Sequence, residues 1–274
     1  MRTIASMHPF DAATLLELLP DGRFRGHTHP AYANMVGPFG GTTAACLLQA
    51  AMQHRARIGE PVALTVNFAA GLADGEFLID ARALRTNRST QHWAIELTQG
   101  GEIAASATAV FALRRETWSM AEAAPPANLP AADSLTRAPL IGRPAWTQRF
   151  DMRFVRGGLP EIFDEQYQPD SVTQVWVRDE PARALDFVAL AALCDSFFPR
   201  IFVRRRKLAP IGTVSLTTYF HADAAMLRAQ GPRHVLGTAR ALNFRNGYFD
   251  QSAEVWSDDW QLLASSHQLV YYRE

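Results

Sequence analysis

Leu64-Thr65-Val66-Asn67-Phe68 recurs 152 residues later as Leu216-Thr217-Thr218-Tyr219-Phe220. Two shorter motifs recur in the same order. Ala-Arg-Ala-Leu at 81–84 returns at 239–242, and Ala-Ser at 105–106 returns at 264–265. The offsets of 152, 158 and 159 residues drift only as loop insertions would make them drift. Three matches in one order indicate that the chain holds two copies of one structural unit.

The expected secondary structure repeats in the same order. In the first half, an apolar stretch after a glycine-rich turn predicts a helix at 40–57, and alternating residues predict strands at 62–68, 76–86, 91–99 and 103–113. In the second half, a helix at 184–204, kinked or broken near Pro199, precedes strands at 213–221, 234–245, 249–256 and 261–272. A leading strand is expected before each helix, at 23–28 and 148–156.

The segment between the halves is rich in proline, with Pro125, Pro126, Pro130, Pro139 and Pro144. Proline at this density sustains neither a helix nor an inner strand, so the segment is expected to be a surface linker. We therefore expect an N-terminal module at 1–115, a linker at 116–145 and a C-terminal module at 146–274.

The helix at 184–204 is apolar around most of its circumference, so other structure must enclose it. A long helix wrapped by a curved antiparallel sheet is the hotdog architecture. Two such modules that pair their sheets edge to edge would form a double hotdog, an α+β fold. A single large α+β domain is the alternative.

Composition excludes several classes of protein. The chain has 274 residues, with 27 Lys plus Arg and 27 Asp plus Glu, so its formal net charge is zero. This balance gives no electrostatic footprint for nucleic acid or an anionic membrane. No apolar run reaches the ~18 residues that span a bilayer, and residues 1–10 lack the pattern of a signal peptide. Cys46 and Cys194 could form a disulfide by count, but both lie in apolar stretches and are expected to be buried free thiols. These features predict a cytoplasmic protein.

One carboxylate, Asp195, interrupts the second apolar helix within Leu-Cys-Asp-Ser-Phe at 193–197. An unpaired buried carboxylate costs several kcal/mol, so the residue serves either structure or chemistry. The structural alternative is an ion pair with Arg200 or a surface turn at the helix end. Thr213 and Gln268, at the start of one strand and within the last one, are unremarkable taken singly.

Two segments of the second half resemble the type II acyl-CoA thioesterases. Thr-Val-Ser-Leu-Thr-Thr-Tyr-Phe-His at 213–221 resembles the strand of that family that begins with a catalytic Thr and ends in an aromatic-Phe-His sequence. Leu-Ala-Ser-Ser-His-Gln at 263–268 resembles the family's last strand, where an Ala-Ser pair precedes a catalytic Gln. Asp195 stands in the preceding helix, where the family has its catalytic Asp.

The first half carries the resemblance more loosely. Gly40-Gly41 resembles the family's helix start, and Arg-Thr-Asn-Arg-Ser at 85–89 resembles its Arg-x-Gly-Arg/Lys-Ser turn, with Asn87 in place of Gly. The strand at 63–68 lacks the family's His residues, and His221 is followed by Ala-Asp instead of Arg-Pro. The resemblance extends from about residue 37 to residue 273, and these departures leave the substrate preference open.

The resemblance implies a cofactor-free acyl-CoA thioesterase of lipid metabolism with no metal. Its acyl-CoA substrate would be hydrolysed by a water that Asp195, Thr213 and Gln268 hold and polarise. Burial of Asp195 would raise its pKa toward neutrality, as base catalysis requires. The remaining implied site residues are Gly40 and Gly41 for the oxyanion, and Arg85, Arg88 and Ser89 for coenzyme A.

One site per chain is expected, because Gln268 shifted back by 159 residues falls on Ala109. The basic run at 204–207 could contact coenzyme A, but a charge run at a helix C-terminus is usually solvated. A homo-oligomer is expected from the architecture, with no nucleic-acid or membrane partner. Two functional alternatives are a hotdog enoyl-CoA hydratase, which would need a His near Asp186, and a non-catalytic acyl-CoA or lipid-binding protein.

Overall fold

The computed structural model describes residues 7–274. Its first half consists of two helices and six strands: α1 (Pro9–Ala13), α2 (Gly40–Gln53), β1 (Glu17–Leu18), β2 (Phe24–His27), β3 (Glu60–Phe68), β4 (Glu76–Thr86), β5 (Thr90–Gln99) and β6 (Glu102–Ala112). Its second half consists of three helices and seven strands: α3 (Phe187–Leu193), α4 (Arg200–Arg205), α5 (Ala224–Gln230), β7 (Phe150–Arg156), β8 (Thr173–Asp179), β9 (Ile211–Phe220), β10 (Val235–Arg240), β11 (Phe244–Arg245), β12 (Tyr248–Trp256) and β13 (Leu262–Tyr272).

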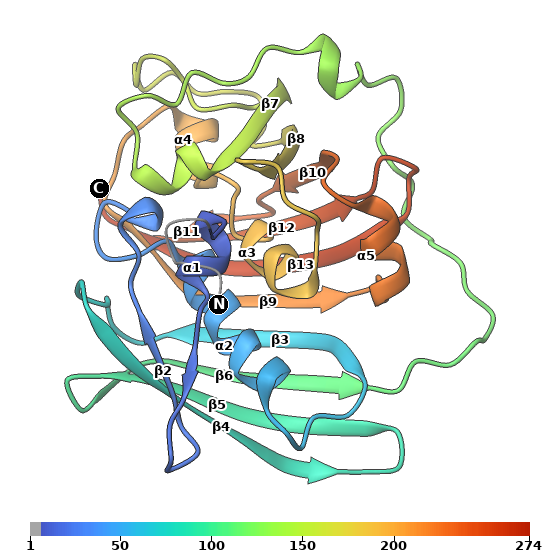
Figure 1. Cartoon of the computed structure of the whole chain (residues 1–274). Helices are drawn as coiled ribbons and strands as arrows, with labels where there is room; N and C mark the ends of the chain where they lie inside the picture. The colour runs from blue at the N-terminus through green and yellow to red at the C-terminus, as the bar shows by residue number, and fades with distance from the viewer. Residues whose placement is uncertain (1–6) are drawn as a thin grey trace.

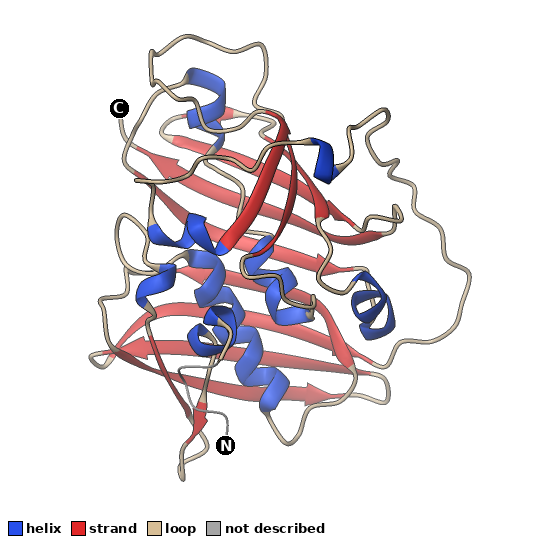
Figure 2. Cartoon of the chain, turned by 45° about the horizontal axis from the view of Figure 1, so that its top comes forward, coloured by secondary structure: helices blue, strands red, loops and turns tan. Residues whose placement is uncertain are grey.

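The strands of the described chain form one antiparallel sheet in the order β1-β2-β4-β5-β6-β3-β9-β13-β12-β10-β8-β7, with β11 paired to β12. The two halves meet edge to edge where β3 pairs with β9, and the sheet curves around the central helices α2 and α3 (Figures 1 and 2). The fold is the predicted α+β double hotdog.

The seam between β3 and β9 shows that the two halves are copies of each other. Thr65 and Thr217 face each other across the seam, and their hydroxyl oxygens are 3.0 Å apart. They are also 152 residues apart, which is the offset of the sequence repeat. Leu64 pairs with Thr218 and Val66 with Leu216, so an approximate two-fold axis passes through the threonine pair.

The expected strands of both hairpin regions are confirmed to within two residues, except that the stretch at 234–245 is divided into β10 and β11. Four helices or strands of the described chain were not predicted, namely α1, β1, β8 and α5. The prediction of one helix at 184–204 is wrong, because the structure has two separate helices there. The first ends at Leu193 and the second begins at Arg200. The proline ring at 199 would clash with the carbonyl of Asp195 in a continuous helix, so the break begins several residues before the proline itself.

The two central helices approach closely because their facing residues are small. A side chain at Gly41 would lie 2.6 Å from the carbonyl oxygen of Ala192, so the N-terminus of α2 can touch the C-terminus of α3 only with glycine at this position. Ten of the fourteen residues of α2 are buried, as is every residue of α3. Cys46 and Cys194 are buried free thiols in this core, as expected.

The proline-rich segment runs outside the sheet. Residues 113–131 contain no helix or strand, and a single 3-10 turn at Ala132–Ser134 follows (Figure 1). No helix within residues 7–274 is long and apolar enough to cross a membrane.

Candidate active site

Asp195 lies in the turn that follows α3, at the point where the two halves meet. The turn places its carboxylate against the N-terminus of α2, and a side chain at Gly40 would lie 2.8 Å from its Oδ2 atom. The carboxylate comes from the second half and the helix start from the first. The proposed ion pair with Arg200 is wrong, because that guanidinium bonds to other groups, described below.

The surroundings of Asp195 hold its pKa near neutrality. The side chain retains a small accessible surface, which faces a cavity, but protein encloses it on its other sides. Burial raises the pKa from 3.8 to about 7, because desolvation disfavours the charged form. Hydrogen bonds from Gln268 and from the Gly41 backbone act in the opposite direction and are the smaller effects.

Gln268 is aimed at Asp195 by the ordinary alternation of β13. Its Nε2 atom donates to Asp195 Oδ1 over 2.8 Å, and the side chain is 4% exposed. The residues two positions away on either side, Ser266 and Val270, are also buried, whereas His267 and Leu269 face outward. The position of Gln268 on the inner face of the sheet could be predicted from the sequence, but its contact with Asp195 could not.

Thr213 reaches the same cavity because of a bulge in β9. Leu269 of β13 pairs with Ser215 and the next residue, Val270, pairs with Thr213, so Val214 is an extra residue. Without the bulge, alternation from the buried Leu216 and Thr218 would turn Thr213 to the outer face. With it, Thr213 lines the wall of the cavity beside Asp195.

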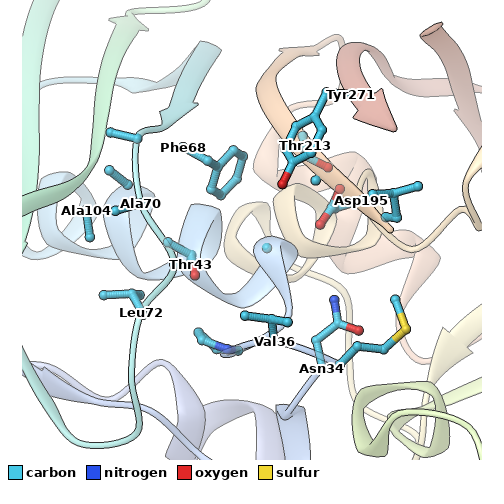
Figure 3. A pocket seen from close by; sticks show the side chains of 18 residues that line it. Asn34, Val36, Thr43, Phe68, Ala70, Leu72, Ala104, Asp195, Thr213 and Tyr271 are labelled. Atoms are coloured by element: carbon cyan, nitrogen blue, oxygen red, sulfur yellow. The ribbon is translucent and has the colours of Figure 1, made fainter. Parts of the chain in front are cut away.

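Two cavities share Asp195 and Thr213 as lining residues, and Figure 3 shows the larger of them. The larger, about 380 Å³, opens between the halves, with Phe68 and Ala104 across from Asp195 and Thr213. The smaller, about 130 Å³, lies mainly in the second half, and Asn34, Met35 and Phe39 of the first half also line it. Its aromatic lining residues are Phe39, Trp146, Phe163, Phe197, Phe198 and Phe202. The carboxylate therefore stands between a larger cavity and a smaller, aromatic one.

The glycines at the start of α2 take part in this arrangement. The first amides of a helix have no carbonyl partner within it, and the Gly41 amide acts on Asp195. Gly40 lines the larger cavity next to the carboxylate. The structure thus brings together Asp195, Thr213, Gln268, Gly40 and Gly41.

The equivalent place in the first half carries no such groups. Ala109 pairs with Leu64 in the first half as Gln268 pairs with Leu216 in the second, so Ala109 is the counterpart of Gln268. The counterpart of Thr213 is Pro61, next to a matching irregularity in β3. Neither residue can bind a water through a polar side chain.

Arg85, Arg88 and Ser89 lie elsewhere. They end β4 and form the turn into β5, where the Leu113 amide donates to the Ser89 carbonyl over 2.9 Å. The cavity adjoins Ala105, at the other end of β6. About eight residues of strand separate these ends, roughly 25 Å, so within one chain the structure does not bring this turn to Asp195.

The basic run at 204–207 ties down the segment that covers the aromatic cavity. Arg206 Nε lies 2.8 Å from Asp164, and Lys207 Nζ lies 3.8 Å from Glu165. Leu159 and Phe163, in the same covering segment, line the cavity. The expectation that this charge run is simply solvated was therefore incomplete, because two of its cations form ion pairs with the loop that covers the cavity.

The fold is that of a double hotdog protein, with a largely buried carboxylate where its two halves meet. Family models for the N-terminal and C-terminal domains of acyl-CoA thioesterases match residues 29–112 and 121–272. The chain belongs to the acyl-CoA thioesterase family and is a thioester hydrolase.

Solved structures agree with this fold. A hotdog-fold protein of unknown function from Alicyclobacillus acidocaldarius is 48% identical, with a TM-score of 0.92 over 98% of this chain and 99% of that one. An acyl-CoA thioesterase II from Mycobacterium marinum is 20% identical, with a TM-score of 0.74 over 96% and 98% of the two chains. A search of curated proteins finds no significant match.

Proposed function

We propose that the chain hydrolyses an acyl-CoA thioester with a water molecule activated by Asp195, and that Thr213 and Gln268 position this water. The observation that carries the proposal is a carboxylate with a pKa of about 7 that lines both a larger cavity and a smaller, aromatic one. A base with a pKa near the working pH is ionised often enough to accept a proton and basic enough to take it.

In the proposed reaction the water oxygen forms a bond to the thioester carbonyl carbon as one of its protons passes to Asp195. The carbonyl oxygen carries the developing negative charge. The intermediate then collapses as the carbon–sulfur bond breaks, and the sulfur leaves as a thiol after it takes the proton back from Asp195. No covalent acyl-enzyme forms, and no metal or cofactor is needed to balance the reaction.

The N-terminus of α2 supplies the group that could hold the oxyanion. The Gly41 amide is engaged with Asp195, so we assign the oxyanion contact to the Gly40 amide, which lies at the cavity wall. The positive end of the helix favours negative charge at this point. Removal of one such donor typically costs about 3–4 kcal/mol of transition-state stabilisation.

The two cavities suggest how the substrate lies. The aromatic cavity suits the acyl group, and the larger cavity between the halves suits the pantetheine arm, with the thioester at Asp195. The prediction that Arg85, Arg88 and Ser89 bind coenzyme A is tested by Arg85→Ala and Arg88→Ala. A contact with the coenzyme raises KM in these variants and leaves kcat unchanged.

Release of free thiol from acyl-CoAs tests the reaction directly. We expect turnover by the wild type and a loss of at least about 100-fold in kcat for Asp195→Ala. Absence of turnover with every acyl chain would favour the acyl-CoA-binding alternative, and full activity of the variant would rule out this site. Active-site titration is expected to give one site per chain.

A further inference from the structure

The aromatic cavity in the second half contains a buried polar group that the proposed reaction does not use. Gln251, on β12, lines this cavity and is 2% exposed. It lies beside Gln268, its partner across the β12–β13 pair. Gln268 is engaged with Asp195, so Gln251 is the next amide along the same wall.

Arg200 fixes which end of the Gln251 amide faces the cavity. The Arg200 Nε atom donates to Gln251 Oε1 over 2.7 Å. A guanidinium has no acceptor, so the atom that meets it must be the amide oxygen. The NH2 group, on the other branch of the amide, then points away from Arg200. Within the described residues no hydrogen bond joins this group to an acceptor, so it can donate to a molecule in the cavity that Gln251 lines.

Arg200 is itself held firmly. It is 0% exposed and donates to the Ser171 carbonyl over 2.8 Å and to the Thr173 hydroxyl over 2.7 Å. No carboxylate among the described residues pairs with it. A buried cation with neutral partners holds Gln251 in one orientation and adds a positive potential behind it.

The first half has a different kind of residue at the equivalent position. Trp93 pairs with Ala109 as Gln251 pairs with Gln268, so Trp93 is the counterpart of Gln251. The indole of Trp93 is 1% exposed and fills the interior of its own module. The second half has a cavity and an amide where the first half has a large apolar side chain.

The size of the cavity limits its ligand. Its volume is about 130 Å³, and an apolar protein cavity of ~150 Å³ holds benzene. One ring, or a branched group of similar size, therefore fills it. A long straight chain exceeds this volume.

We propose that the substrate's acyl group is compact, about the size of one ring, and carries a neutral oxygen that accepts a hydrogen bond from the Gln251 amide. This inference rests on the proposed thioesterase function. A neutral oxygen is favoured over a carboxylate because the Asp195 carboxylate lines the same small cavity. Gln251 is thus a specificity-determining residue.

A matched pair of substrates tests the proposal. Methoxybenzoyl-CoA and ethylbenzoyl-CoA have nearly the same size, but only the first carries an acceptor oxygen in its ring substituent. With the substituent at the 3- or 4-position, we expect wild-type kcat/KM to be about tenfold higher for the methoxy ester, the effect of one hydrogen bond to a buried donor. Dodecanoyl-CoA and carboxybenzoyl-CoA should be poorer substrates than either.

Gln251→Glu keeps an acceptor for Arg200 but replaces the amide donor with an oxygen. In this variant the ratio of kcat/KM for the methoxy ester to kcat/KM for the ethyl ester should fall to about one. Thr147→Val, on the same cavity wall, is the control. Its hydroxyl already donates to the Pro144 carbonyl over 2.8 Å, so the ratio of the two esters should not change.

Two results would overturn the proposal while the thioesterase function stands. One is equal wild-type activity on the two esters, or higher activity on the dodecanoyl or carboxybenzoyl ester. The other is a methoxy preference that persists in Gln251→Glu. The wild-type comparison decides the question even if the variant does not fold. Failure of the thioesterase function itself is distinct, since no ester would then release thiol.

Discussion

Asp195→Asn should stabilise the protein at alkaline pH while it lowers kcat by about 100-fold or more. In the folded chain burial raises the Asp195 pKa from 3.8 to about 7, so the folded state binds this proton more tightly than the unfolded state does. Below about pH 4 the carboxyl group of Asp195 therefore does not lower the free energy of unfolding. As the pH rises this free energy decreases, and the full decrease is reached above about pH 7. The difference between the two pKa values corresponds to about 4 kcal/mol, because each unit is worth ~1.4 kcal/mol.

An asparagine removes this cost but also one acceptor oxygen. The lost hydrogen bond offsets about 1 kcal/mol, which leaves a gain of about 3 kcal/mol at pH 8. For a chain of this size that is a rise of roughly 6–10 °C in Tm. At pH 4 the gain should vanish or become a small loss.

Thermal unfolding at pH 4 and pH 8 checks this prediction, with thiol release measured on the same samples. Asp74→Asn, at an exposed turn, is the control and should change neither quantity. An Asp195→Asn variant with unchanged Tm at pH 8, or with the same rise at both pH values, would refute the argument that burial destabilises the charged carboxylate.

Three further substitutions test the parts of the site. Gly40→Ala places a methyl group 2.8 Å from Asp195 Oδ2 and should lower kcat at least about tenfold. Gly71→Ala, where a methyl group meets only Val36 at 3.9 Å, should not. Thr213→Val should lower kcat by about tenfold or more with little change in Tm. A Thr213→Val variant with the kcat of the wild type would contradict the role of Thr213 in positioning the water. Asp164→Asn should loosen the segment over the aromatic cavity and raise kcat/KM for longer acyl chains relative to short ones, and an unchanged chain-length profile would count against that role.

The fold could be predicted because duplication leaves its record in local sequence. The repeated strand that includes Thr65 and Thr217 became the seam of the sheet, and the offset between the copies equals the separation of that pair. Strand β8 was missed although Thr-Gln-Val-Trp-Val-Arg-Asp at 173–179 alternates as a strand does. It has no counterpart among the repeated motifs, all of which lie in the hairpin regions.

The site was less accessible from the sequence, because its geometry depends on irregularities. The bulge at Val214 turns Thr213 inward, and no residue pattern announces it. The break after α3 frees Asp195 from the helix, and only the distant proline hints at it. The sequence suggested Arg200 only as an ion-pair partner of Asp195 and gave no sign of Gln251, since the burial of these two residues and their mutual contact arise from tertiary packing.

The pH dependence of kcat/KM tests the central role of Asp195 most directly. We expect wild-type thiol release to fall about tenfold for each pH unit below an apparent pKa of about 7, since only the ionised carboxylate accepts the proton of water. The residual activity of Asp195→Asn should show no such transition. A wild-type rate that is constant between pH 5 and pH 8, or a transition that the variant retains, would contradict the assignment of Asp195 as the base.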